Sequence, residues 1–138
     1  MNIHVRDCNS EERNIVVALW TRCGLTRPWN DPAVDFDLAL SGPSSTVLGG
    51  FADSALVASL MVGFDGHRGW VYYLAVDEAH RGRGFGKRMM HSAEAWLREK
   101  RAPKLQFMVR EGNDAALNFY AKLGFERQPV ITLGRAID

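Results

Sequence analysis

Trp70-Val-Tyr-Tyr-Leu-Ala-Val76 leads directly into Asp77-Glu-Ala-His-Arg-Gly-Arg-Gly-Phe-Gly-Lys87, and this stretch decides the fold. Its first part carries no charge and is rich in valine and aromatic residues, which predicts a strand covered on both faces. Its second part predicts a polar turn, a glycine-rich loop and the start of an amphipathic helix. That helix keeps its apolar residues on one side at helical spacing, namely Phe85, Met89, Ala93, Trp96 and Leu97.

The loop alternates basic residues with glycines, in the order Arg81, Gly82, Arg83, Gly84, Phe85, Gly86 and Lys87. Glycines at a helix start let a ligand approach the backbone closely, and the first amides of a helix have no partner within it. These amides, the positive end of the helix dipole and the basic side chains together favour an anion. The loop therefore predicts a phosphate-bearing cofactor, although a loop of this composition also occurs simply as a solvated turn.

Two familiar phosphate-binding patterns do not fit this loop. The P-loop requires Ser or Thr after Gly-Lys, whereas Arg88 follows Gly86-Lys87 and offers no hydroxyl for magnesium. The dinucleotide pattern is Gly-x-Gly-x-x-Gly, whereas this loop has Gly-x-Gly-x-Gly and no clear acidic ribose partner after a second strand.

The composition suits one domain, 1–138, with a sizeable core. The near balance of 17 basic and 16 acidic residues argues against a nucleic-acid binder, which usually has a strong basic excess. No stretch resembles a signal peptide or approaches the roughly 20 apolar residues of a membrane span. We therefore expect a cytoplasmic protein with no membrane partner.

The metal-ligating residue types show no ligand pattern. Cys8 and Cys23 are too few for a disulfide framework and lack metal-ligand spacing, and the four histidines form no His-x-x-x-His pair. We therefore expect no metal. A second basic cluster, 98–104, predicts a solvated helix end that complements the helix dipole.

Local signals predict the remaining elements. Alternation predicts a first strand over 2–7, and Ser10 followed by acidic residues predicts the cap of a helix that ends near Gly24. A proline-containing loop leads to a second helix capped by Asp31 and beginning at Pro32. Further strands are predicted at 46–52, 56–64 and 105–109, a last helix at 115–122 with Gly124 after it, and one or two closing strands within 125–133.

The order of these elements predicts the topology. The strands on either side of the long helix form a β-α-β unit, so they should be parallel with a right-handed crossover. The earlier strands are joined by short turns and should be antiparallel. We therefore expect an α/β fold with a mixed sheet, in which antiparallel N-terminal strands precede a parallel central pair and helices cover both faces.

Two separated segments resemble the GNAT superfamily of acetyl-CoA-dependent N-acetyltransferases. One is Arg81-x-x-Gly84-x-Gly86 after an apolar strand, and the other is Asn113-x-x-Ala116-x-x-Phe119-Tyr120-x-Lys122-x-Gly124-Phe125. The first is similar to the family's diphosphate-binding motif and the second to its cofactor-side helix. The order of elements also matches that fold over essentially the whole chain. The stretches 27–32 and 65–69 resemble those of small bacterial members and imply no substrate.

The resemblance implies acetyl-CoA as the acyl donor and an amine as the acceptor. Backbone amides across the loop would hold the diphosphate of the cofactor, with the basic side chains beside it; the residues concerned are Arg81, Gly82, Arg83, Gly84, Phe85, Gly86 and Lys87. The main chain of Leu74, Ala75 and Val76 would hydrogen-bond the pantetheine arm, where the parallel strands of this family splay apart. Asn113 would contact the cofactor and Tyr120 would face its sulfur.

The chemistry of acetyl transfer supports these assignments. An amine with a pKa of roughly 8–10 is mostly charged at neutral pH, so a base or a water relay is needed. An outward main-chain N–H at the strand splay could serve the oxyanion. The thiolate, with a pKa near ~8.5 by analogy to cysteine, could be protonated by the Tyr120 hydroxyl. In competing interpretations, Tyr120 is a core residue with its hydroxyl at the rim and Asn113 is only a helix cap.

The sequence leaves the general base open. Many relatives carry a glutamate on the strand before the last helix, whereas 105–109 contains no acid. Asp65, His67, Glu111 or a water chain remain as candidates. Trp29 beside Arg27 could shape the acceptor pocket, or Trp29 could pin its loop to the core.

The sequence therefore predicts an enzyme that transfers acetyl from acetyl-CoA to a primary amine of a small molecule or a protein. An acyl-CoA-binding sensor or assembly module with little transferase activity is the alternative from another class, and a hydroxyl acceptor is a third. The sequence also leaves open whether the chain forms a homodimer.

Overall fold

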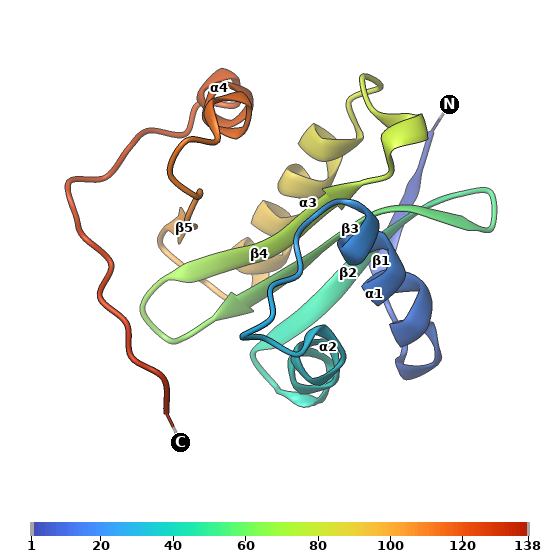
Figure 1. Ribbon diagram of the computed structural model, residues 1–138, viewed down its shortest axis with the longest axis horizontal. Coiled ribbons are helices and arrows are strands. Elements are labelled where there is room, and N and C mark those ends of the chain that lie inside the picture. The colour runs from blue at the N-terminus through green and yellow to red at the C-terminus, as the bar shows by residue number, and fades with distance from the viewer. Residues whose placement is uncertain (1, 138) are drawn as a thin grey trace. The chain divides into compact units, whose positions relative to one another are not determined.

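Residues 2–137 are described by the computed structural model shown in Figure 1. The chain divides into two compact units, Met1–Met108 and Val109–Asp138, and each is described by itself. The expectation of one domain over 1–138 stays a prediction.

The first unit is built on a five-stranded sheet whose strands lie side by side in chain order. These are β1 (His4–Asp7), β2 (Ser45–Ala52), β3 (Ala55–Phe64), β4 (Gly69–Val76) and β5 (Leu105–Gln106). The first four strands pair antiparallel and β4 pairs parallel with β5, which confirms the expected mixed sheet. The predicted strand 105–109 is shorter than expected, because pairing with β4 ends at Gln106.

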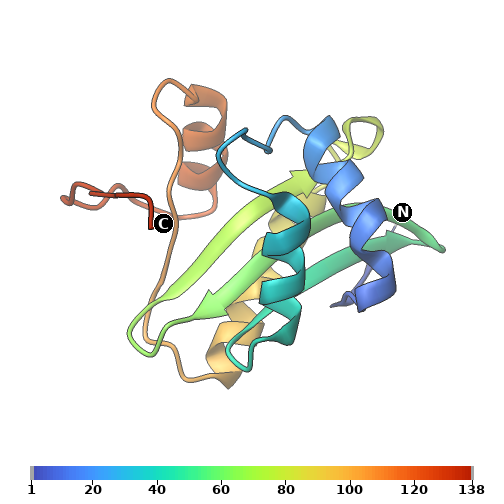
Figure 2. The same cartoon turned by 60° about the horizontal axis from the view of Figure 1, so that its bottom comes forward.

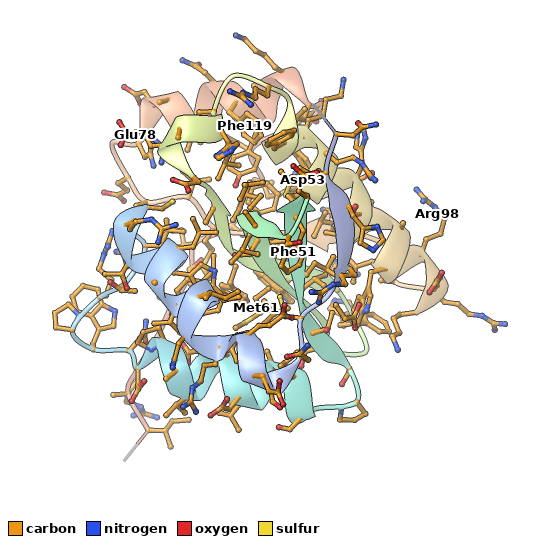
Figure 3. The ribbon with its side chains drawn as sticks, turned by 90° about the vertical axis from the view of Figure 1, so that its right-hand side faces the viewer. Phe51, Asp53, Met61, Glu78, Arg98 and Phe119 are labelled. Carbon is orange, nitrogen blue, oxygen red and sulfur yellow. The ribbon has the colours of Figure 1, made fainter. Side chains whose placement is uncertain are left out.

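Helices cover both faces of this sheet, as expected. Their bounds are η1 (Ser10–Glu12), α1 (Arg13–Arg22), α2 (Pro32–Ser41), η2 (Glu78–His80) and α3 (Phe85–Glu99). Figures 1 and 2 show α1 and α2 on one face of the sheet and α3 on the other. Arg98, in the last turn of α3, points away from the ribbon in Figure 3, in agreement with the expected solvated helix end.

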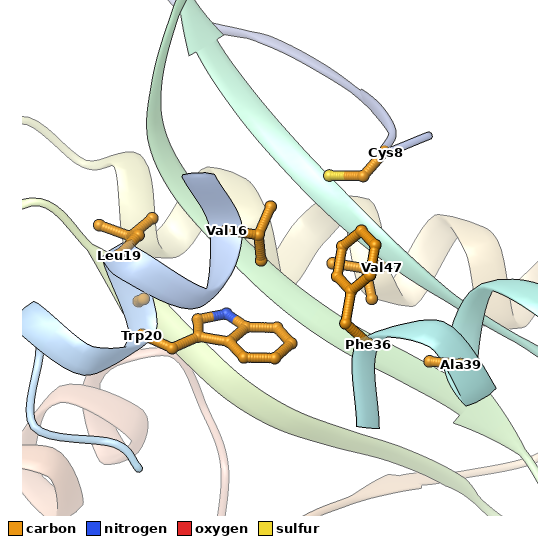
Figure 4. Close-up of a cluster of buried hydrophobic side chains, with 8 residues drawn as sticks. Cys8, Val16, Leu19, Trp20, Phe36, Ala39 and Val47 are labelled. Atoms are coloured by element: carbon orange, nitrogen blue, oxygen red, sulfur yellow. The ribbon is translucent and has the colours of Figure 1, made fainter. Parts of the chain in front are cut away.

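The core has one layer on each side of the sheet. Figure 4 shows the first layer, in which Trp20 of α1 and Phe36 of α2 pack beside Val47 of β2. The second layer is the apolar side of α3, which buries Phe85, Met89, Met90, Ala93 and Leu97. Burial of each large apolar side chain contributes about 1.5–3 kcal/mol, so both layers hold the helices firmly on the sheet.

The prediction that Ser10 caps the first helix is wrong, because Asn9 is the cap. The Asn9 side chain accepts from the Glu11 N–H at 3.0 Å, and the Glu12 carboxylate accepts from the Asn9 N–H at 2.9 Å. Arg6 holds the same carboxylate by two hydrogen bonds of 2.9 and 2.8 Å. The glutamate three residues after Asn9 completes a capping box. Ser10 has no glutamate at the same spacing with which to form one.

The other predicted helix boundaries in this unit are confirmed. Asp31 accepts from the N–H groups of Ala33 and Val34 at 3.0 and 3.2 Å, and Pro32 begins α2. Gly24 ends α1 with a φ of 72°, and the Leu25 N–H donates back to the Trp20 carbonyl at 3.0 Å. A residue with positive φ in this position is the usual end of a helix.

The prediction that β4 is covered on both faces is wrong at Tyr72, whose side chain is 43% exposed. β4 pairs with β3 from Gly69 to Val76, but with β5 only at Gly69 and Trp70, so most of one edge has no neighbouring strand in the first unit. An uncharged, aromatic-rich sequence suits such a position as well, because tyrosine has an apolar body and a polar tip.

The second unit contains α4 (Asp114–Lys122), close to the predicted 115–122. The predicted closing strands within 125–133 are not formed in the structure, where residues 125–137 are neither helix nor strand. Val130, Ile131 and Leu133, whose apolar character suggested these strands, are 76%, 88% and 90% exposed. A strand needs a ladder with a partner strand, and alternation within one segment does not supply it.

Candidate functional site

Strand β4 contains a bulge where it passes the middle of β3. Tyr72 pairs regularly with β3 and the pairing resumes at Ala75, so that Tyr73 and Leu74 together lie opposite Leu60. Tyr73 has a φ of 58°, a left-handed conformation that costs a non-glycine residue about 1–3 kcal/mol. Bulges re-aim main-chain groups and are common beside active sites.

The main chain of Leu74 and Val76 faces the edge of β4 that points away from β3. The Asp77 N–H donates to a β3 carbonyl at 2.8 Å. Because the groups alternate along an antiparallel strand, those of Ala75 also point to β3 and those of its two neighbours point away. On that outer edge, pairing with β5 ends opposite Trp70, although β4 continues to Val76. Pairing between the two parallel strands therefore stops before Leu74 in this unit, and the splay expected there stays a prediction.

Helix α3 begins beside this edge without a side-chain cap. Its first internal hydrogen bond runs from the Arg88 N–H to the Gly84 carbonyl at 3.0 Å, and Gly84 occupies the N-cap position. The N–H groups of Phe85, Gly86 and Lys87 therefore have no partner within the helix. Three unpartnered amides at the positive end of a 15-residue helix form a site for an anion.

The glycines before α3 keep the space over these amides open. Gly82 and Gly84 have φ values of 78° and 81°, which only glycine adopts readily, and a Cβ at either position would meet no atom within 4 Å. Arg81, Arg83 and Lys87 are exposed around the same opening. Backbone donors, open space and positive charge thus coincide, as the sequence predicted.

The underside of the loop is attached to the strand and the core. Phe85 is buried, and its ring stacks with that of His80 at a centroid distance of 6.4 Å. The Arg81 Nε donates to the Val76 carbonyl at 3.1 Å. The His80 Nδ1 is buried with no hydrogen-bond partner. Arg81 therefore links the loop to the end of β4.

Asn113 and Tyr120 belong to the second unit. The Asn113 side chain accepts from the Ala116 N–H at 3.1 Å and caps α4, as the competing interpretation of this residue expected. Tyr120 lies edge-on to Phe119 and Phe125, at centroid distances of 5.0 and 6.0 Å. Burial raises the pKa of Tyr120 to about 12, so its hydroxyl keeps its proton at neutral pH.

The structure argues against two of the four candidate bases. Asp65 accepts from the N–H groups of His67 and Arg68 at 2.8 and 2.7 Å and from the Trp70 Nε1 at 3.1 Å. These hydrogen bonds hold the pKa of Asp65 below its usual range, and the one from the Arg68 N–H has the largest effect. The hairpin that carries Asp65 and His67 ends about 16 Å along β4 from Leu74, at about 3.3 Å per residue. Both residues therefore lie at the wrong end of the strand.

Sequence reasoning missed a contact at the bulge. The Tyr73 hydroxyl donates to the Asp35 carboxylate at 2.7 Å, and the Tyr73 ring stacks on Trp20 at a centroid distance of 4.0 Å. Asp35 is 38 residues away in the sequence, on the first turn of α2. The only sequence signal was a tyrosine in the middle of an apolar strand.

The loop between α1 and α2 carries an exposed aromatic residue. Trp29 is 67% exposed. Whether it shapes the acceptor pocket or pins its loop to the core stays a prediction. The Arg27 Nη1 donates to the carbonyls of Gly24 and Thr26 at 2.8 and 2.9 Å and so shapes the loop.

A surface hollow of about 660 Å³ lies elsewhere in the first unit. Asp7, Ser41, Trp96 and Lys100 are among its lining residues, so it is at the C-terminal end of α3. Trp96 is about 16 Å along the helix from Phe85, at 1.5 Å per residue. The hollow is therefore separate from the uncapped amides.

The remaining reactive side chains show no further centre. Cys8 is buried, and this burial raises the pKa of its thiol to about 12, which makes it unreactive. Within residues 2–137, no three His, Cys, Asp or Glu side chains gather into a group that could hold a metal ion. None of the helices described has the length and apolarity needed to span a bilayer.

Sequence comparison shows the family. The sequence profile of the acetyltransferase (GNAT) family matches residues 12–125. A protein named acetyltransferase from Yersinia pestis is 39% identical over 135 residues, covering 98% of this chain and 96% of its own. One of the same description from Yersinia enterocolitica is 43% identical over 122 residues, covering 88% and 86%.

Solved structures share the fold at low sequence identity. The aminoglycoside N-acetyltransferase AAC(6')-Iy, in complex with a bisubstrate analogue, aligns with a TM-score of 0.84 at 15% identity over 100% of both chains. A ribosomal-protein-alanine N-acetyltransferase from Brucella melitensis aligns with a TM-score of 0.78 at 17% identity, covering 97% of this chain and 99% of its own.

The chain belongs to the acetyltransferase (GNAT) family. It is an acetyl-CoA-dependent acetyltransferase.

Proposed function

We propose that the enzyme transfers the acetyl group of acetyl-CoA to a primary amine by direct attack within a ternary complex. The observation that carries this proposal is the uncapped N-terminus of α3, whose first three amides have no partner within the helix. The two glycines just before it, Gly82 and Gly84, are open to solvent. A diphosphate is the part of acetyl-CoA that such a site binds.

The donor is proposed to lie along β4 and the loop. The amides from Gly82 to Lys87 hold the diphosphate, with Arg81 and Arg83 adding charge, and the outward main chain of Leu74 and Val76 receives the pantetheine arm. The Val76 carbonyl accepts from Arg81, so Leu74 is the freer of the two for the arm. Asn113 is proposed to contact the cofactor in addition to capping α4.

The proposed reaction is a balanced acyl transfer. The nitrogen lone pair of the neutral amine attacks the thioester carbonyl carbon, and a C–N bond forms. The attacking nitrogen, now positively charged, loses a proton to water. The tetrahedral oxyanion then collapses, the C–S bond breaks, and the sulfur takes the electron pair. The Tyr120 hydroxyl donates a proton to this sulfur, and the tyrosine is restored from solvent.

The properties of Tyr120 support this role. Its raised pKa of about 12 keeps the hydroxyl protonated over the whole physiological range. The same pKa makes Tyr120 a weaker acid than a thiol of pKa ~8.5. We therefore propose that its hydroxyl first stabilises the developing thiolate by a hydrogen bond, and that the proton is transferred afterwards.

We propose that the amine loses its proton through water. Asp65 is fully engaged in its hairpin turn, and His67 lies in the same hairpin. A water relay needs no carboxylate on 105–109, where the sequence has none. The free thiols of Cys8 and Cys23 fit a reducing compartment, and we place the enzyme in the cytoplasm.

The experiment is a screen of acceptors with the purified protein and acetyl-CoA. Free thiol release is followed over a panel of small primary amines, lysine peptides and peptide N-termini, with alcohols of matched shape as controls. We expect release that depends on at least one amine and not on the matched alcohol. Tight binding of acetyl-CoA with no amine-dependent release would instead favour a binding module, and release with the alcohols would move the acceptor class to hydroxyls.

A further inference from the structure

Tyr73 is the residue of the bulge whose side chain is held most completely. Its hydroxyl donates to the Asp35 carboxylate at 2.7 Å. Its ring lies parallel to Trp20, with centroids 4.0 Å apart and planes inclined by 6°. Trp20 is fully buried and donates from its Nε1 to the Ser59 hydroxyl at 2.8 Å. The residue with the left-handed backbone is thus tied to α1, α2 and β3 at once.

These contacts surround the irregular part of the sheet. Ser59 pairs with Ala75, immediately after the bulge, and Tyr73 lies in the bulge itself. Trp20 therefore contacts both strands at the place where their register shifts. Because Trp20 has a 0% exposed side chain and a hydrogen-bonded nitrogen, it gives the Tyr73 ring a fixed surface to rest on.

The consequence for the main chain follows from the bulge geometry. The peptide between Tyr73 and Leu74 carries the Leu74 N–H, which faces the open edge of β4. Its direction depends on the Tyr73 backbone torsions, and the left-handed φ of 58° is not one that a tyrosine keeps without support. The Asp35 hydrogen bond and the Trp20 stack supply that support.

We propose that Tyr73, held by Asp35 and Trp20, is a positioning residue for acetyl transfer that fixes the direction of the Leu74 N–H toward the thioester. The Tyr73 hydrogen bond is a strong one because a carboxylate, that of Asp35, accepts it. The inference rests on the proposed use of the β4 main chain by the pantetheine arm. It adds to that proposal a side-chain device that holds the strand in its working conformation.

The test compares Tyr73→Phe with two further variants. Tyr73→Phe removes only the hydroxyl and keeps the ring on Trp20. Asp35→Asn replaces the carboxylate that accepts the Tyr73 hydrogen bond by an amide. Tyr72→Phe is the matched control, because it makes the same chemical change at the next residue, which has ordinary pairing and is 43% exposed.

The main measurement does not depend on the acceptor. Acetyl-CoA labelled with ¹³C at the carbonyl is bound to each variant, and its carbonyl chemical shift is compared with that of the free compound. A hydrogen bond from a main-chain N–H should move the bound signal downfield. We expect this movement in the wild type and in Tyr72→Phe, and a clearly smaller one in Tyr73→Phe and Asp35→Asn, with acetyl-CoA affinity changed by less than about twofold.

Turnover with the acceptor found in the screen gives the second measurement. We expect kcat to fall about tenfold in Tyr73→Phe, which corresponds to about 1.4 kcal/mol of transition-state stabilisation. A double variant that combines Tyr73→Phe with Asp35→Asn should lose no more than the larger of the two single losses, since both changes affect the same hydrogen bond.

Three results would overturn the inference. An unchanged carbonyl shift and kcat in Tyr73→Phe, with only a lower melting temperature, would leave Tyr73 a purely structural residue. Equal effects in Tyr72→Phe and Tyr73→Phe would remove the special role of the bulge. A wild type that binds acetyl-CoA without moving the carbonyl signal would reject the proposed course of the arm along β4, and the inference with it. If Tyr73→Phe fails to fold, Asp35→Asn decides in its place.

Discussion

Replacing Gly84 with aspartate is expected to weaken acetyl-CoA binding on the order of a hundredfold. A carboxylate at the N-cap of α3 would stand against the diphosphate, and two unit charges about 5 Å apart near a protein surface repel by about 3 kcal/mol. The new side chain would also accept hydrogen bonds from the amides that the cofactor needs. Calorimetric titration of acetyl-CoA into each variant measures the loss.

Gly84→Asn provides the matched control for this substitution. Gly84 has a φ of 81°, and a Cβ there would meet no atom within 4 Å. Asn and Asp both tolerate this left-handed conformation and both cap helices, so the two variants differ only in charge. We expect Gly84→Asn to bind more weakly than the wild type and clearly more tightly than Gly84→Asp. Equal affinity in all three proteins would refute the assignment of the loop to the diphosphate.

Replacing Tyr120 with phenylalanine is expected to lower kcat by about 10²-fold, within the range that general acid catalysis contributes. The phenyl ring keeps the edge contacts to Phe119 and Phe125, so acetyl-CoA affinity and folding should change little. Steady-state kinetics at saturating acetyl-CoA measure kcat, and thermal unfolding measures stability.

The pH dependence sharpens the test of Tyr120. Because burial raises the pKa of its hydroxyl to about 12, the protonated form that donates to sulfur persists until the pH approaches that value. Ionisation of Tyr120 should therefore cause no loss of wild-type activity from about pH 6 to about pH 10, because this whole range lies below that pKa. If turnover is retained in Tyr120→Phe while the melting temperature falls, Tyr120 is a packing residue.

The sequence predicted the parts of the structure that depend on neighbouring residues. The run from Trp70 to Lys87 predicted a strand, a loop and a helix start, and the structure has all three. Asp31 and Gly24 mark helix ends through hydrogen bonds to residues a few positions away. The parallel pairing of β4 with β5 followed from the handedness of the crossover.

The features that sequence reasoning missed depend on distant residues. The bulge at Tyr73 is defined by its register against Leu60, and the Tyr73 hydroxyl finds Asp35 across 38 residues. No local pattern reports either contact. The closing strands expected within 125–133 failed for the same reason, because a strand requires a partner that a short apolar run does not specify.

The residues proposed to bind the cofactor divide in the same way. The amides at the start of α3 and the open edge of β4 both lie within the first unit. The roles of Asn113 and Tyr120 stay predictions from the motif and the chemistry of their side chains. Variants of Asn113 and Tyr120 therefore test roles that the fold of the first unit does not address.

The most direct measurement is a backbone amide NMR titration of the ¹⁵N-labelled protein with acetyl-CoA. The N–H signals of Phe85, Gly86 and Lys87, which have no partner within α3, should move downfield and saturate with the binding curve, together with that of Leu74. Amides at the far end of α3, near Trp96, should stay in place. If acetyl-CoA binds and saturates while the signals of Phe85, Gly86 and Lys87 do not move, the uncapped start of α3 is not the donor site.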